Sequence, residues 1–261
     1  MRALVLLLGG CAPTLGGDPA RVDSPRILAV WAEPPEARPG EVVTLQALVA
    51  GADGPTFAWC TEARSVAENR VASQGCLVGE AVASTPAAAT VPADACALFG
   101  SEPPPAGPGE PPRRPADPDA SGGYYQPVRA TAAGAPPALG RVRVRCALPG
   151  APAEVAVRFA TEARPNQNPG LAAAEPVETQ GEFALAITLD PPETYLAYDV
   201  ATATLSTRTE AHRATWYTDS GTLTGDLAEA RWVPEGRPAQ AWVVVRDDRG
   251  GVAVASWRLP E

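Results

Sequence analysis

The chain has 261 residues, contains no lysine and only one histidine, and has no long apolar run beyond its first ten residues. All 21 basic residues are therefore arginine, and the 30 acidic residues give a formal net charge of −9 at pH 7. Such a charge repels the phosphate backbone of nucleic acids, so nucleic acid is not an expected partner. A membrane-spanning helix needs about 18 apolar residues or more, so any membrane attachment is expected to come from the N-terminus.

Catalytic side chains are also scarce. His212 is the only imidazole, it lies in TEAHRATW, where alternation predicts the entry to a strand, and no G-x-S-x-G sequence accompanies it. Asp219 opens an Asp-Ser-Gly-Thr sequence that resembles the catalytic loop of aspartic proteases. That chemistry uses two carboxylates that share a proton, and the chain has no second loop of this kind. We therefore predict a structural or surface His212, a turn at Asp219, no enzymatic activity and no cofactor.

Proline and glycine, in contrast, are abundant, with 30 and 24 residues, and aromatic residues make up 6% of the chain. Together proline and glycine account for about a fifth of the residues, which suits a loop-rich β-protein better than a disordered chain. The length is sufficient for two domains of about 100 to 140 residues, each with its own core.

The first eleven residues, MRALVLLLGGC, have the pattern of an export signal. Arg2 supplies positive charge, Ala3 to Leu8 form an apolar segment, and the sequence Leu-Gly-Gly-Cys ending at Cys11 resembles a bacterial lipobox. In proteins with a lipobox the cysteine is diacylated and the peptide before it is removed. The resemblance implies a lipid on Cys11 and a location in the cell envelope, as an outer-membrane lipoprotein on the periplasmic face or the cell surface.

The remaining cysteines form an even set, which in an exported chain is typical of disulfides: Cys60, Cys76, Cys96 and Cys146. Four cysteines permit three pairings, and no C-x-x-C or Cys/His spacing of a zinc site occurs. If Phe57 and Trp59 face a core, Cys60 points away from it, whereas Cys146 points inward with its neighbouring valines. This parity favours the pairs Cys60–Cys76 and Cys96–Cys146 over a bridge between Cys60 and Cys146.

Alternating apolar residues predict strands in the first half of the chain. RILAVWA, VVTLQALV and FAWC are separated by Pro-Gly and Asp-Gly turns, and their order, with a tryptophan in the third strand, resembles strands A to C of an immunoglobulin-like sandwich. RVRVRC and EVAVRF alternate in the same way and predict a closing hairpin. Arg141, Arg143 and Arg145 share the polar face of the first of these two strands. We expect that face to be solvated, with carboxylates nearby, and an anion-binding patch is the alternative.

Residues 61–127 are predicted to be a long insertion in the first domain. The stretch EPPPAGPGEPPRRPADPDASGG favours extended polyproline II over helix. Tyr124 and Tyr125, near its end, are interpreted either as an exposed aromatic platform for a sugar or peptide or as the start of a strand that returns to the sandwich.

The predicted fold class is all-β, with two immunoglobulin-like β-sandwich domains in tandem and no amphipathic helix. Beyond the first domain, EFALAITL, ATATL, RATWYT and AQAWVVVRDDRGGVAVASWRL predict a second set of strands without cysteine. The boundaries are a signal peptide at 1–11, a tether at 12–25, a first domain at 26–163, a linker (RPNQNPG) at 164–170 and a second domain at 171–261.

One acidic stretch invites a metal hypothesis. Asp117, Asp119 and Ser121, followed by glycine, match the start of a calcium loop, in which oxygen donors occupy alternate positions. The bidentate acid expected at about the twelfth position of such a loop is replaced by Val128. Calcium at these residues is therefore kept as an alternative, and no metal site is predicted.

Several stretches resemble a family of uncharacterised predicted lipoproteins from myxobacteria and their relatives: LLLGGC, RILAVWAEPPEARPGE, ADACALFG, DPDASGGYYQPVR, RPNQNP, ETYLAYD and VVVRDDRGGVAVASW. The resemblance implies tandem immunoglobulin-like domains on a lipid anchor and transfers no catalytic residue. We expect a non-enzymatic cell-envelope protein whose domains bind an envelope protein or glycan or act as a spacer. The alternative is a carbohydrate-binding or calcium-dependent adhesion module, and the fold alone does not decide between them.

Overall fold

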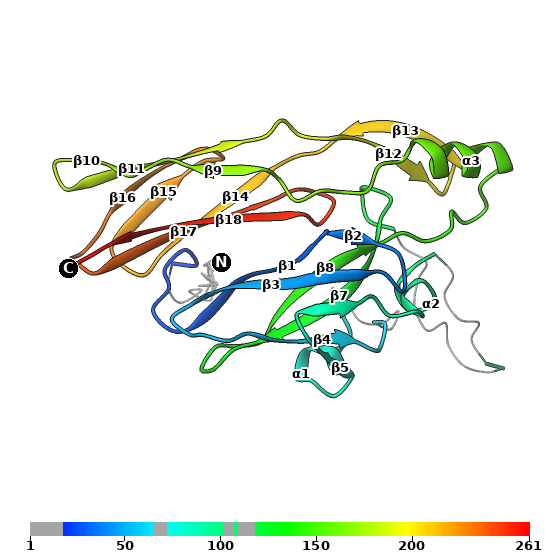
Figure 1. Ribbon diagram of the computed structural model, residues 1–261, viewed down its shortest axis with the longest axis horizontal. Coiled ribbons are helices and arrows are strands. Elements are labelled where there is room, and N and C mark those ends of the chain that lie inside the picture. The colour runs from blue at the N-terminus through cyan, green and yellow to red at the C-terminus, as the bar shows by residue number, and fades with distance from the viewer. Residues whose placement is uncertain (1–17, 65–71, 102–106, 109–117) are drawn as a thin grey trace, which may run out of the picture.

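A computed structural model describes residues 18–64, 72–101, 107–108 and 118–261 (Figure 1). The predictions for Cys11 and Asp117 lie outside these residues. The described residues are mostly β-strands arranged in several sheets, with three short helices, so the predicted all-β class is confirmed. No helix among them is both long and apolar enough to cross a membrane.

The N-terminal β unit, residues 26–144, consists of two sheets. The first has the order β1–β3–β6 and contains β1 (Arg26–Glu33), β3 (Val42–Ala50) and β6 (Ala88–Thr90). The second has the order β2–β8–β7–β4–β5 and contains β2 (Glu36–Ala37), β4 (Thr56–Cys60), β5 (Val82–Thr85), β7 (Tyr124–Thr131) and β8 (Ala138–Val144). Neighbouring strands are antiparallel except β2 and β8, which pair in parallel.

The core of this unit lies between the two sheets. Alternating residues of β3, Val43 and Leu45, pack with Phe57 and Trp59 of β4, which face the core as the parity prediction requires. Two strands, β5 and β6, fall in the range predicted to be an insertion and pair with β4 and β3. That range therefore contributes to both sheets.

Two disulfides connect helices of the N-terminal unit to its sheets. Cys60, at the end of β4, is bonded to Cys76 in α1 (Gln74–Val78), and Cys96 in α2 (Ala95–Phe99) is bonded to Cys146, just after β8. This is the pairing that side-chain parity favours. Each bridge closes a loop, and its effect on the unfolded chain stabilises the fold by about 3 to 4 kcal/mol.

The C-terminal β unit, residues 171–259, also contains two main sheets. The first has the order β10–β11–β16–β15, with β9 paired to the other end of β11: β9 (Leu171–Ala173), β10 (Val177–Thr179), β11 (Glu182–Leu189), β15 (Thr222–Gly225) and β16 (Glu229–Val233). The second has the order β14–β17–β18: β14 (Arg213–Thr218), β17 (Ala239–Arg246) and β18 (Val252–Leu259). A separate hairpin is formed by β12 (Thr194–Asp199) and β13 (Thr204–Thr209).

Helix α3 (Ala153–Glu162) replaces the strand that was predicted to close the first domain. The predicted hairpin and the predicted absence of an amphipathic helix are therefore wrong. Val155 and Phe159 fit a strand period, but they also lie four residues apart, which places them on one side of a helix. Alanine-rich composition and the Arg158–Glu162 ion pair, one helical turn apart, favour the helix.

The two β units lie side by side along their length (Figure 1). The outer face of β1 and β3 packs on the outer face of β14, β17 and β18, so four sheets are stacked. The buried residues between the units are Val22, Leu28, Ala29, Ala50, Tyr217, Trp242, Val244 and Val252.

Residues 18–25, the described part of the predicted tether, are attached to the C-terminal unit. Val22 donates its backbone N–H to the carbonyl of Thr218 at 2.8 Å, and Thr218 donates to the carbonyl of Ala20 at 3.0 Å. These bonds fix the chain just before β1.

Candidate functional site

The interface between the two β units is built by strands that are apolar on both faces. In β17, Val243 and Val245 point into the core of their own unit, whereas Trp242 and Val244 point towards the N-terminal unit. β1 is likewise buried continuously from Ile27 to Val30. Strands buried on both faces read as continuous apolar runs, and the runs ILAV and AWVVV are that signal.

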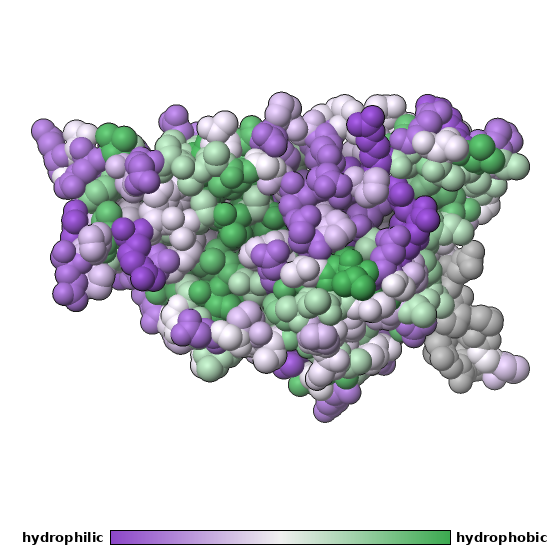
Figure 2. Space-filling view, viewed as in Figure 1, coloured by the Kyte–Doolittle hydropathy of each residue, from purple (hydrophilic) through white to green (hydrophobic). Residues whose placement is uncertain are grey.

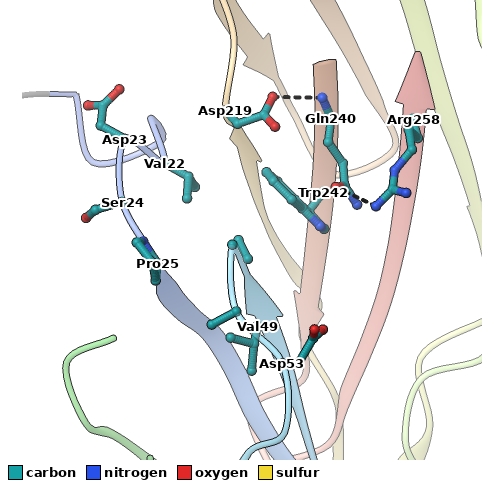
Figure 3. A pocket seen from close by; sticks show the side chains of 13 residues that line it. Val22, Asp23, Ser24, Pro25, Val49, Asp53, Asp219, Gln240, Trp242 and Arg258 are labelled. Atoms are coloured by element: carbon teal, nitrogen blue, oxygen red, sulfur yellow. Dashed lines mark hydrogen bonds between the residues drawn. The ribbon is translucent and has the colours of Figure 1, made fainter. Parts of the chain in front are cut away.

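A groove of about 550 Å³ opens at one end of this interface (Figure 3). It lies where β1 and β17 begin and β3 ends. Residues 22–25 and 49–53 line its N-terminal side, and Asp219, Gln240, Trp242 and Arg258 line the side of the C-terminal unit. On the face shown in Figure 2, apolar side chains gather along the left part of the seam between the units, and hydrophilic side chains gather over its right part.

Three aspartates and one arginine supply the charge of the groove. Asp23 pairs with Arg21 at 3.0 Å, and Arg258 reaches the carboxamide oxygen of Gln240 at 3.4 Å. Within the described residues, Asp53 has no ion pair or side-chain hydrogen bond. The groove therefore presents both acceptors and donors to solvent.

Asp219, the residue of the protease-like sequence, lies in this groove and forms a turn as predicted. Its carboxylate accepts the backbone N–H of Gln240 at 2.7 Å, and the Ser220 hydroxyl accepts the N–H of Glu235 at 3.0 Å. Gly221 has a φ of +75°, and a Cβ there would collide with the Val233 carbonyl. The local sequence Asp-Ser-Gly is thus explained by turn geometry.

Trp242 differs from the other tryptophans of its unit. The indole N–H groups of Trp216, Trp232 and Trp257 donate to backbone carbonyls at 2.7 to 2.9 Å. Trp242 is only 3% exposed and lines the groove, yet its N–H donates no hydrogen bond to any described residue. The Trp242 N–H is therefore open to solvent in the groove, where it leaves a hydrogen-bond donor available.

The opposite end of the interface holds a cluster of charges, most of them buried, here called the ionic cluster: Glu36, Arg143, Arg145, Glu193, Glu210, Asp247 and Arg249. Arg249, in the turn between β17 and β18, is 3% exposed. Its guanidinium contacts Glu210 at 3.0 Å, Glu193 at 3.4 Å and Glu36 of the other unit at 3.3 Å. It also lies 4.5 Å from the ring centroid of Tyr195.

On the N-terminal unit, the cluster includes two of the three arginines predicted to be solvated. Arg143 and Arg145 contact the Glu36 carboxylate at 3.3 and 3.2 Å, and Arg143 is only 7% exposed. Arg141 lies 4.2 Å from the ring centroid of Tyr125. A carboxylate lies beside this face as expected, but Arg143 is not solvated, because the parallel strand β2 brings Glu36 beside β8 and Arg249 of the C-terminal unit contacts the same carboxylate.

The predicted linker at 164–170 ties the two units together. Asn166 donates its backbone N–H to Glu36 at 2.9 Å and its side-chain amide to Asp247 at 3.1 Å. Asn168 donates to the Ala32 carbonyl at 2.9 Å and accepts the N–H of Val252 at 2.8 Å. Each asparagine thus bonds to both β units.

Asp247 occupies the turn that DDRGG predicts. Its Oδ1 accepts the backbone N–H groups of Arg249 at 2.8 Å and Gly251 at 2.7 Å, while Oδ2 accepts the amide of Asn166. The turn therefore holds Arg249 in position and joins it to the linker.

His212 lies just before β14, as predicted, with its Nε2 4.0 Å from the Glu210 carboxylate. Burial, reinforced by the nearby charge of Asp247, raises the pKa of Glu210 to about 7, although Arg249 opposes the shift. The histidine thus belongs to the edge of the ionic cluster.

The residues considered for calcium already make hydrogen bonds within the protein. Asp119 Oδ1 accepts the backbone N–H of Ser121 at 2.9 Å and its hydroxyl at 2.5 Å, and Ser121 Oγ accepts from Arg143 at 2.6 Å. Arg143 thus supplies the positive charge beside this turn. No group of three or more His, Cys, Asp or Glu side chains suited to a metal occurs in the described ranges.

Tyr124 and Tyr125 begin β7, which is the strand interpretation of that pair. The Tyr125 hydroxyl accepts a hydrogen bond from Arg143 at 3.1 Å, and burial raises the pKa of Tyr125 to about 12. They form no exposed platform.

Comparisons with protein-family models, with curated proteins and with solved structures gave no match. The function is therefore argued from the groove and the ionic cluster themselves.

Proposed function

We propose that the protein is a non-enzymatic, lipid-anchored cell-envelope protein whose two immunoglobulin-like units form one rigid binding module. The strand order supports the immunoglobulin-like assignment, since β10–β11–β16–β15 opposes β14–β17–β18, and each unit has a buried tryptophan, Trp59 in β4 and Trp216 in β14. The continuous apolar interface, with two asparagines that bond to both units, favours a rigid body over a flexible spacer.

The groove carries the binding part of this proposal. It combines an indole N–H of Trp242 without a described partner, a carboxylate of Asp53 without a described partner and the guanidinium of Arg258. Ligand sites typically have such a mixture, in which a few directed polar groups line a concave surface. Asp18, the first described residue, is seven residues after Cys11, a span of at most about 25 Å. A lipid on Cys11 would therefore keep the groove close to the membrane surface.

Carbohydrate binding is the second candidate, and the chemistry of the groove favours it. Carboxylates, a carboxamide, a guanidinium and an indole N–H are the donors and acceptors that match sugar hydroxyls. The calcium-dependent form of the alternative has less support, because Asp119 and Ser121 already bond to each other and to Arg143.

The experiment is a pelleting assay with insoluble Gram-negative cell-wall sacculi as the probe. Wild type is compared with Trp242→Phe and Asp53→Asn, which alter the groove, and with Asp94→Asn, a matched change at an exposed aspartate outside it. Binding that is reduced at least about tenfold by the groove variants and kept by the control supports the groove. Binding that is unaffected by both groove variants rejects it, and no binding rejects cell-wall glycan as the ligand.

The anchor is tested separately with the Cys11→Ala variant in a Gram-negative host. Partition into the detergent phase and an intact mass increased by acyl chains, both lost in the variant, support the lipid. A soluble, unacylated wild type rejects it.

A further inference from the structure

The ionic cluster, at the end of the interface away from the groove, has a surplus of carboxylates. It contains four acids, Glu36, Glu193, Glu210 and Asp247, and three arginines, Arg143, Arg145 and Arg249. Arg143 and Arg145 both point to Glu36. In the C-terminal unit, Glu193 and Glu210 share the guanidinium of Arg249.

Glu210, which follows β13, is the most buried of the carboxylates that Arg249 serves. Its charged and titratable neighbours come from several elements: Arg249 and Asp247 from the β17–β18 turn, Glu193 before β12 and His212 before β14. Across the interface, Glu36 of β2 contacts the same guanidinium at 3.3 Å. Glu210 and Glu36 thus share the charge of Arg249, Glu210 through Nη1 and Glu36 through Nη2.

We infer that Glu210 is a proton-sensitive latch: uptake of one proton by its carboxylate tightens the contact between the two β units. A neutral Glu210 no longer draws on the charge of Arg249, so Arg249 interacts more strongly with Glu36 of the other unit. Protonation of Glu210 also removes its repulsion with Asp247, whose Oδ2 accepts a hydrogen bond from the side chain of Asn166 in the linker. Loss of the proton reverses both effects.

The direction of the pH dependence follows from the burial of this side chain. The pKa of Glu210 is about 7 in the folded protein, above its ordinary value of 4.5. The folded state then binds the proton more tightly than the unfolded chain does, so the associated stability is present in mild acid and is lost as pH rises through 7. The contact between the two β units is therefore tighter near pH 5.5 than near pH 8.

The test compares thermal unfolding of the full chain at about pH 5.5 and about pH 8 for wild type, Glu210→Gln and Glu178→Gln. Glu210→Gln keeps the shape of the neutral carboxyl and removes its titration, whereas Glu178→Gln makes the same change in an exposed pair with Arg237. We expect the wild-type midpoint to fall by about 4–8 °C more than that of Glu210→Gln, with Glu178→Gln following the wild type.

Hydrogen exchange locates the effect at the interface. The backbone N–H of Asn166, which is bonded to Glu36, is expected to lose protection from pH 6 to pH 8 in wild type, after correction for the intrinsic exchange rate, and to keep it in Glu210→Gln.

Equal pH slopes for wild type and Glu210→Gln overturn the inference, as does unchanged protection of Asn166. If Glu210→Gln does not fold, carboxyl carbon NMR of the wild type decides: a carboxyl titrating near pH 7 supports the latch, and none above about pH 5.5 overturns it.

Discussion

Replacing Arg249 by alanine is the strongest test of how the two β units are held together. Its guanidinium lies within 3.4 Å of three carboxylates from both units, and the side chain is 3% exposed. Removing one partner from a buried ionic group leaves uncompensated charge, which costs about 3–5 kcal/mol. For a chain of this size we expect the unfolding midpoint to fall by about 6–20 °C at pH 8.

The same variant has a pH signature. Without Arg249, Glu210 loses the cation that opposes its protonation, so Arg249→Ala is expected to lose less stability at pH 5.5 than at pH 8. Thermal and urea unfolding at both pH values give the two losses. A second substitution, Glu210→Gln, removes one of the stranded charges and is expected to recover part of the loss at pH 8.

The matched control is Arg231→Ala. Arg231 forms a bidentate ion pair with Glu182, at 2.6 and 2.8 Å. Its side chain is 73% exposed, so solvent screens the pair. We expect little change in this variant. If Arg249→Ala proves as mild as Arg231→Ala, or loses equal stability at both pH values, the role assigned to the ionic cluster is refuted.

Three further outcomes are expected. The Cys96→Ser/Cys146→Ser variant should lose about 1 kcal/mol more stability than Cys60→Ser/Cys76→Ser in urea titrations, because its loop has 50 residues of separation against 16; the reverse order would contradict this entropy argument. Trp242→Phe should destabilise less than Trp232→Phe, since only the Trp232 indole donates a hydrogen bond, to the Ser220 carbonyl; thermal melts of the pair decide. Excess calcium or a chelator should leave the midpoint unchanged, because Arg143 supplies the charge beside Ser121, and a rise with calcium would favour the adhesion alternative.

Local sequence patterns predicted the features that depend on alternation, on turns or on side-chain parity within one strand. Val43 and Leu45 face the core as their alternation requires, Asp219 and Asp247 form turns, and the disulfide pairing follows the parity of β4. The spacing of Val155 and Phe159 fits two periods, so that alternation alone did not distinguish a strand from α3.

The interface was missed because its partners are far apart in the sequence. Glu36 and Arg249 are 213 residues apart, and nothing near either residue marks the other. From sequence alone, an arginine on the polar face of a strand is expected to be solvated. Arg143 is buried because a second unit covers it. The continuous apolar runs in β1 and β17 were the available signal, since a strand with one solvated face alternates and these do not.

The two ends of the interface have different physical roles. Apolar contacts between β1, β3 and β17 favour association but are non-directional, and they tolerate sliding of one sheet over another. The ionic cluster tolerates little sliding of one unit over the other. Glu36 needs Arg249, Arg143 and the Asn166 N–H in fixed positions to compensate its burial. The ionic cluster therefore sets the alignment of the two units, and that alignment brings residues 49–53 opposite Trp242 and so defines the shape of the groove.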